Sequence, residues 1–238
     1  MVAPIRPERV EYTQLQAVDT PKPTETWSPL QHHTLYDAVK HRLEQKGFEI
    51  ADTTHLLSHE DNRYFGTVCL KPEEGVPYAR MVGIRNSHDK RFCASIVAGA
   101  RVICCANGMF VGDELALSRK HTSRIHDDLP QKIDESFGKL LQEWKRNDMR
   151  LLEYQATTIS DMDANDLIIR SLDNGAIASS AIPEVLKQYR EPPHEQFKPR
   201  TLWSLHNAFT EVLKKHPLLV SERSRALQKT FDEDLILS

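Results

Sequence analysis

The sequence predicts an α+β fold: a helix, an antiparallel β-sheet of three to four strands, then a long helix and a helical C-terminal part. Two changes of hydrophobic period support this fold class. Apolar residues recur every four residues early in the chain, alternate with polar residues in the middle, and return to helical spacing after residue 127. The predicted parts are an extended or disordered leader (1–30), an α+β core domain (31–150) and a helical part packed on that core (151–238).

The first thirty residues contain five prolines and no sustained periodicity, which is typical of an extended arm. The first helix follows them, because Leu35, Val39 and Leu43 fall on one helical face. Thr34 is suited to cap the N-terminus of this helix, and Gly47 supplies the kind of residue with which helices commonly end.

Three segments are predicted to be strands: residues 63–71, 78–86 and 93–110. In each, apolar and polar residues alternate, β-branched residues are frequent, and glycines interrupt or flank the segment. The third segment is long enough for one long strand or two short ones. Because the connections between these segments are short, antiparallel pairing is favoured over crossover connections.

Helical spacing returns at Asp128 and Pro130, which mark the start of a long amphipathic helix. Its apolar stripe includes Leu129, Ile133 and Phe137. The C-terminal part is predicted to contain four more helices, which run from Ser160 to the Asn174-Gly175 pair and over residues 182–189, 201–215 and 221–231.

The net charge of the chain is −3, but the charges are unevenly distributed and the middle of the sequence is basic. Residues 63–124 contain ten basic and five acidic side chains, so this segment carries +5 and the rest of the chain −8. Clustered lysine and arginine raise the local positive potential and suit an anionic ligand. A solvated sheet face balanced by acidic helices explains the same count, so both interpretations stay open.

Composition points to a cytoplasmic protein. The apolar stretches are far shorter than the roughly 20 residues of a membrane span, and the first residues lack the apolar centre of an export signal. The spacing of the cysteines does not suit a disulfide framework or a zinc site, so free thiols in a reducing compartment are expected at Cys69, Cys93, Cys104 and Cys105. The eleven histidines lack ligand spacing such as HExxH, and neither a metal nor another cofactor is expected.

The densest polar cluster lies between two predicted strands and admits three interpretations. A catalytic site would use Asn86, Ser87, His88 and Asp89, although the members of a Ser-His-Asp triad come from separate chain segments. A structural turn would use the same residues, since Asn, Ser and Asp bond nearby backbone groups. An anion site would use the adjoining cations Arg85, Lys90 and Arg91.

Four blocks of sequence resemble, in order, the phage/plasmid-like family built on domain of unknown function 932. They are residues 83–89 (GIRNSHD), 99–108 (GARVICCANG), 119–122 (RKHT) and 202–211 (LWSLHNAFTE), the last similar to that family's closing N-A-x-T-E helix. Lys90 departs from the family, in which a small residue such as glycine usually follows the His-Asp pair. The resemblance implies carriage on mobile elements, among genes for DNA replication, recombination and defence.

The predicted order of elements is also similar to the core of single-strand annealing proteins of recombination, which is a likeness of fold alone. We therefore expect a nucleic-acid-binding protein that binds or anneals single strands, with single-stranded DNA as its expected partner. We also expect a homo-oligomer and no association with a membrane. Stacking is expected from Tyr64, Phe65 or Tyr78. The phosphate contacts are expected from Arg80, Arg85, Lys90, Arg91, Arg101, Arg119 and Lys120.

Two alternatives remain at this level. One is an enzyme in which His88 and Asp89 act as acid and base, or bind a metal, near Cys105 and Asn107. The other is a module that binds a host protein through its acidic helices, for which the sequence carries no signature.

Overall fold

The computed structural model describes residues 7–74, 76, 78–102, 108–110, 116–215 and 219–237, and it confirms the α+β class. The chain divides into two compact units. Unit 1 comprises Met1–Gly99 and Glu114–Gln142, and unit 2 comprises Ala100–Asp113 and Glu143–Ser238. Within the described ranges, no helix is both long and apolar enough to cross a bilayer.

The predicted count of three to four strands is wrong, because the sheet is larger. Six strands follow one another in the order β1-β2-β3-β4-β5-β6, and β7 pairs with β5 away from this path. The pairings of β1 with β2, β2 with β3, β3 with β4 and β5 with β7 are antiparallel. The strands are β1 (Glu8–Val10), β2 (Ile50–Ser58), β3 (Arg63–Leu70), β4 (Tyr78–Ser87), β5 (Ala94–Val102), β6 (Gly108–Phe110) and β7 (Leu117–Arg119).

The additional strands have weak local signals. The strand β1 has only three residues and lies in the proline-rich leader, where it pairs along the edge of β2. The strand β2 contains the polar run Asp52-Thr53-Thr54, which hides its alternation. Since β propensity depends strongly on the neighbouring strand, the pairing partner decides such segments rather than their own pattern.

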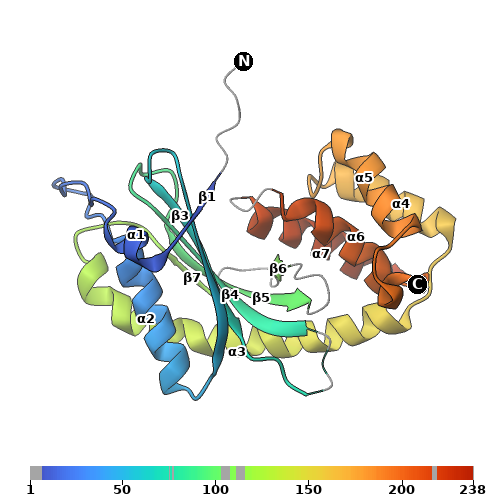
Figure 1. Cartoon of the computed structure of the whole chain (residues 1–238), viewed down its shortest axis with the longest axis horizontal. Helices are drawn as coiled ribbons and strands as arrows, with labels where there is room; N and C mark the ends of the chain where they lie inside the picture. Colours follow the sequence, from blue (N-terminus) through green and yellow to red (C-terminus); the bar gives the residue numbers. More distant parts are fainter. Residues whose placement is uncertain are drawn as a thin grey trace. The chain divides into compact units, whose positions relative to one another are not determined.

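Unit 1 contains β1 to β4, β7, most of β5 and the first part of a long helix, together with two shorter helices, α1 (Tyr12–Gln16) and α2 (His32–Gln45). The predicted stripe Leu35, Val39 and Leu43 is fully buried, and α2 packs on β3 and β4. Figure 1 shows α2 lying against the sheet. Burial of each such side chain contributes about 1.5–3 kcal/mol, so this stripe anchors the helix to the strands.

The long helix α3 (Ile125–Ala156) has 32 residues and begins three residues before the predicted start. Asp127 and Asp128 lie in its first turn, where carboxylates complement the partial positive charge of a helix N-terminus. Its residues to Gln142 belong to unit 1 and the following ones to unit 2.

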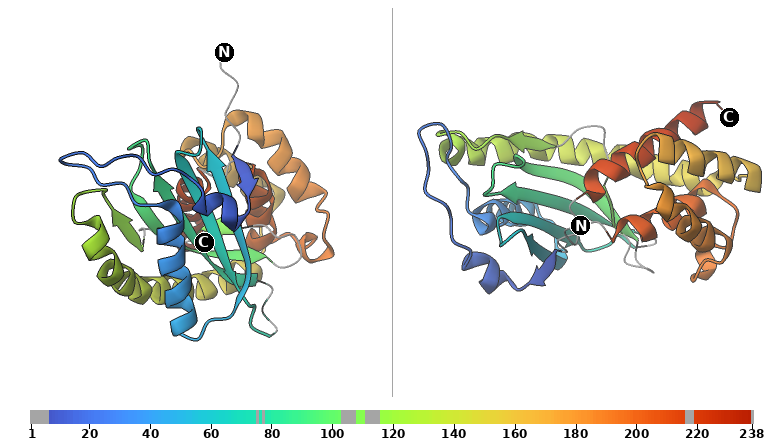
Figure 2. Two further views of the ribbon diagram at one scale, coloured as in Figure 1. Left: turned by 60° about the vertical axis from the view of Figure 1, so that its left-hand side comes forward. Right: turned by 90° about the horizontal axis from the view of Figure 1, so that it is seen from above.

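Unit 2 consists largely of helices, which Figure 2 shows grouped together in orange to red. Ser160 caps the first of them in a reciprocal arrangement with Asp163. Rings of Phe209 and Phe231 meet edge to face at 5.8 Å, which joins two of these helices through their apolar faces. The helices are α4 (Asp161–Asp173), α5 (Ile182–Arg190), α6 (Leu202–Leu213) and α7 (Val220–Leu237), with short 3₁₀ turns at Ser179–Ala181 and Glu195–Phe197.

Candidate functional site

A buried network of histidines lies in unit 1, where the end of β4 meets the start of α2 and the segment after β7. We call it the histidine network, and it consists of His32, Asn86, His88 and His121. None of these four side chains is more than 6% exposed. Two of the sequence blocks, 83–89 and 119–122, therefore meet in space.

Asn86 is the centre of this network. Its amide Nδ2 donates to the Leu30 carbonyl oxygen at 2.7 Å and to His32 Nδ1 at 2.9 Å. Its Oδ1 accepts from His121 Nε2 at 2.7 Å. Because Nδ2 faces a carbonyl oxygen, the orientation of the amide is determined by its surroundings. All the hydrogen-bonding capacity of the Asn86 amide nitrogen is thus used inside the protein.

The tautomer of His32 follows from its two partners. Its Nε2 donates to the Asp61 carbonyl oxygen at 3.0 Å, so its Nδ1 is the acceptor that Asn86 requires. The His32 ring stacks on His88, with centroids 3.9 Å apart and planes 9° from parallel. His88 Nε2 in turn donates to the Leu30 carbonyl oxygen at 2.9 Å. Two stacked imidazoles at this distance favour the neutral forms, because two positive charges would repel.

Burial keeps the network uncharged. Burial lowers the pKa of His32 to about 3 and that of His121 to about 4. Repulsion from the protonated form of His88 is a further cause of both shifts. Burial also lowers the pKa of His88, although the carbonyl groups of Leu30 and Asp19 act in the opposite direction. Within the part of the chain that the structure describes, no three His, Cys, Asp or Glu side chains are placed to hold a metal ion.

The turn between β2 and β3 is strained and is held by this network. His59, Glu60 and Asp61 have φ values of 56°, 54° and 61°, a left-handed conformation that costs roughly 1–2 kcal/mol for each L-residue. The His32 ring binds the Asp61 carbonyl, and the His88 amide N–H donates to the Asn62 carbonyl at 2.7 Å. Strain of this kind persists only where the surrounding structure determines it.

Tyr64 extends the same buried layer across the sheet. It pairs with Asn86 in the β3–β4 register, and its hydroxyl lies 3.0 Å from His55 Nδ1. A Cβ at Gly66 would collide with that hydroxyl, so only glycine lets the Tyr64 side chain lie along β3. Tyr64 is 0% exposed and is therefore a core residue rather than a stacking surface.

Ser87, His88 and Asp89, from the proposed catalytic cluster, each have partners within the protein. Ser87 Oγ donates to the Phe92 carbonyl oxygen and accepts from the Phe92 amide, which closes the turn after β4. Asp89 binds Arg63 Nε at 2.6 Å; burial acts to raise the pKa of Asp89, but the Arg63 and Arg91 hydrogen bonds lower it overall. His88 is 5% exposed with its Nε2 occupied. Cys104, Cys105 and Asn107 lie outside the described residues.

Three of the seven predicted phosphate contacts are engaged by the partners named here. Arg80 pairs with Glu73 at 2.8 Å, and Arg119 pairs with Asp128 at 2.6 Å. Arg85 lies over the Phe92 ring at 4.7 Å. Because side chains alternate along a strand, Arg80 and Arg85 point to opposite faces of β4. These arginines therefore do not form one continuous patch.

The remaining cations are differently placed. Lys90 Nζ lies 4.8 Å from the centroid of the Trp27 ring, and its φ of 61° falls where glycine would be favoured. Arg91 and Lys120 are exposed, and neither side chain has an ion-pair partner among the described residues. Arg101 belongs to unit 2.

Several residues of this site have no recognisable signal in the sequence. His32 and His121 stand among eleven scattered histidines, and Trp27 lies in the leader. Asn86, which joins the two histidines, lies 54 positions from His32 and 35 from His121 along the chain. Only the motif around Asn86 and His88 pointed to this region, and it did so without indicating which residues complete it.

Comparison with known families gives one match. Residues 22–233 match the family model described as "Domain of unknown function (DUF932)". No curated protein and no solved structure matches the chain.

Proposed function

The chain belongs to the DUF932 family, and from that premise we propose that it is a non-catalytic protein that binds single-stranded DNA. We assign the binding to a surface of unit 1 that consists of Trp27, Lys90, Arg91 and Lys120, called here the Trp27 surface. Lys90 lies over the Trp27 ring, and Arg91 follows it in the chain. The Trp27 ring lies 6.3 Å from that of His121, the neighbour of Lys120.

The combination of an aromatic ring with unneutralised cations carries this proposal. Proteins that bind single strands stack bases on aromatic side chains and contact phosphates with lysine and arginine. The Trp27 ring is partly exposed, so a base can reach part of its surface, although its indole N–H is buried and has no hydrogen-bond partner among the described residues. Arg91 and Lys120 keep their charge free for phosphate.

In this proposal the histidine network has a supporting role. It connects the segment of Leu30, the β2–β3 turn and His121 through neutral hydrogen bonds. A rigid support reduces the conformational entropy that the binding surface loses when it contacts DNA. His88 and Asp89 therefore support the loop that carries Lys90 and Arg91.

The setting we propose is the DNA metabolism of phages and plasmids, including recombination by annealing. The four sequence blocks support it, as does the order of a helix, an antiparallel sheet and a long helix. We propose further that the protein acts as a homo-oligomer. Met149 and Leu152, one turn apart on α3 and 59% and 66% exposed, support self-association.

Fluorescence anisotropy with labelled single- and double-stranded DNA and RNA, at about 50 and 200 mM salt, tests the proposal. We expect binding that prefers single-stranded DNA and weakens steeply with salt. The double variant Arg91→Ala/Lys120→Ala should bind more weakly and show a salt slope smaller by roughly 1.4, since each phosphate contact on a single strand contributes about 0.7.

The matched control is Lys46→Ala/Lys139→Ala, which removes two exposed charges of unit 1 away from the Trp27 surface. It should bind as the unchanged protein does. Absence of binding to every probe at about 50 mM salt, or equal weakening by the two double variants, would overturn the proposal.

A further inference from the structure

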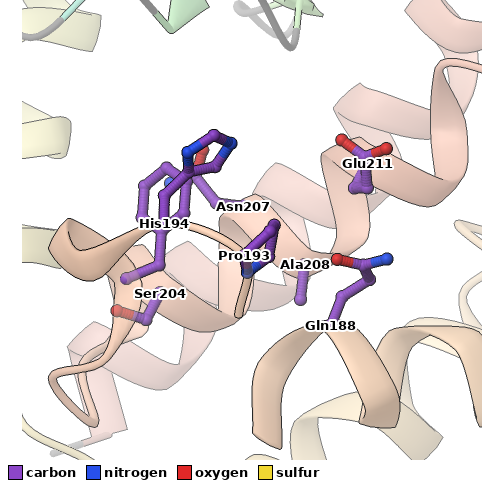
Figure 3. A pocket seen from close by; sticks show the side chains of 8 residues that line it. Gln188, Pro193, His194, Ser204, Asn207, Ala208 and Glu211 are labelled. Atoms are coloured by element: carbon purple, nitrogen blue, oxygen red, sulfur yellow. The ribbon is translucent and has the colours of Figure 1, made fainter. Parts of the chain in front are cut away.

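A small pocket in unit 2 lies beside α6 and has no part in the function proposed above. Its cavity volume is about 10 Å³, roughly the smallest space that holds one water molecule. Figure 3 labels the lining side chains of α6 together with Gln188 of α5 and with Pro193 and His194 of the segment that follows it. The lining residues are Gln188, Pro193, His194, Phe197, Ser204, Asn207, Ala208 and Glu211.

Three of these residues come from the N-A-x-T-E motif (207–211) that closes the fourth sequence block. Asn207, Ala208 and Glu211 occupy positions i, i+1 and i+4, which lie on one side of a helix. Phe209 and Thr210, between them, are buried in the helical core instead. The spacing of the motif therefore places its amide and its carboxylate at the same pocket.

Asn207 has an acceptor without a partner. Its Nδ2 donates to the Trp203 carbonyl oxygen at 2.8 Å, which determines the orientation of the amide. The Oδ1 atom is buried and accepts no hydrogen bond among the described residues. The whole side chain is 2% exposed. An unsatisfied buried acceptor is unfavourable, so a donor that enters the pocket would be stabilised there.

Two further residues of the lining, Glu211 and Gln188, offer acceptor oxygens, beside His194 and Ser204, which can both donate and accept. Glu211 supplies a carboxylate, whose ion pair with Lys214 spans only one helical turn. Gln188 donates its Nε2 to Glu184 at 3.0 Å, which leaves its Oε1 as an acceptor. The Phe197 ring lies at the same pocket. Acceptor oxygens, a carboxylate and an aromatic ring together select a cation.

We propose that this pocket binds a primary ammonium group. Such a group has N–H donors for the unpartnered Asn207 Oδ1, and its positive charge complements the Glu211 carboxylate of the pocket lining. It is also about the size of a water molecule, as the cavity volume requires. The ammonium is carried either by a free alkylamine or by a lysine side chain of a partner protein.

Nuclear magnetic resonance titration of the ¹⁵N-labelled full chain tests this site, with sodium chloride at equal ionic strength as the baseline. The probes are n-butylammonium, the peptide acetyl-Gly-Lys-Gly-amide, and tetramethylammonium, which has no N–H donor and is too large. We expect the chemical shifts of the Asn207 side-chain amide signals to change in a saturable way with the first two probes only. Tighter binding of the peptide, by about tenfold or more, identifies a lysine side chain; equal or weaker binding identifies a free amine.

Glu211→Gln should weaken butylammonium binding by about tenfold, because it removes the charge but keeps the shape. The control is Glu195→Gln, which breaks an equivalent i,i+3 pair with Lys198 outside the pocket lining and should leave binding unchanged. The proposal is overturned if butylammonium causes no saturable shift, if tetramethylammonium causes the same shift, or if the two variants behave alike. The pocket then holds water only.

Discussion

Single residues of unit 1 have roles that depend on what lies opposite them. Asn86 is an ordinary turn-forming residue by its sequence context, yet in the fold it is 0% exposed and joins three segments of chain. Gly66 shows the same dependence. Nothing beside it in the sequence calls for glycine, but the Tyr64 side chain occupies the space of its missing Cβ.

Gly66→Ala should therefore destabilise the protein by about 1–3 kcal/mol, the usual cost of overpacking a core. The Tyr64 hydroxyl would have to move away from His55 Nδ1, and the ring is buried and cannot swing into solvent. Urea unfolding measures the free-energy change. The matched control is Gly138→Ala in α3, where a Cβ meets no atom within 4 Å. That variant should stabilise by about 0.5–1 kcal/mol, as alanine does inside a helix.

Among the secondary-structure elements, the β2–β3 turn is the most unusual. Asn62 Nδ2 supports it by donating to the carbonyl oxygens of His59 and Glu60 at 3.0 and 3.2 Å. Arg63 adds contacts to His59 Nε2 and to Asp89, so this turn is tied to the loop that carries Lys90. Three successive left-handed residues without glycine are maintained by these tertiary bonds, not by local preference.

Glu60 provides a test of that strain, because it is exposed and has a φ of 54°. We expect Glu60→Gly to be more stable than Glu60→Ala by about 1 kcal/mol, since only glycine adopts this conformation without a steric cost. Comparing the two variants by chemical denaturation removes the effect of losing the glutamate itself. Equal stability of the glycine and alanine variants would contradict the strained conformation of the turn.

At the scale of the whole molecule, each of the two units contains histidine that is buried in a neutral form. His32 and His121 belong to unit 1. His206 belongs to unit 2, where burial lowers its pKa to about 3 and the charge of Arg150 acts in the same direction. A histidine with a folded pKa below its ordinary value of 6.5 binds its proton more readily in the unfolded chain. The contribution of these neutral histidines to the free energy of unfolding is therefore fully present above pH 6.5, and it is lost as the pH falls toward 4.

The pH dependence of urea unfolding should show this loss. Each histidine with a folded pKa near 4 or below costs about 2 kcal/mol at pH 5 relative to neutral pH. His121→Gln keeps an N–H donor for Asn86 and should reduce the dependence between pH 7 and 5 by that amount. His41→Gln, which removes an exposed histidine of α2, should keep the original dependence. An unchanged profile in His121→Gln would show that His121 is not held neutral.

The α+β class and the helical segments could be predicted because their signals are local. The stripe Leu35, Val39 and Leu43 repeats within ten residues and predicts both α2 and its buried face. The strands β3 and β4 likewise carry alternation, and the predicted strand 78–86 ends one residue before β4 does. The edge strand β1 and the full extent of the sheet were not predicted, because three residues carry too little pattern.

The sequence by itself determined the fold class, the basic centre and the position of one polar motif in the chain. Only the tertiary structure decided that Asn86 meets His32 and His121, 54 and 35 positions away. It also decided that three predicted phosphate contacts, Arg80, Arg85 and Arg119, are occupied or turned apart, while Lys90 reaches Trp27. The physical reason is that periodicity encodes which face of an element is buried, whereas a hydrogen bond or ion pair requires the partner that only chain folding brings near.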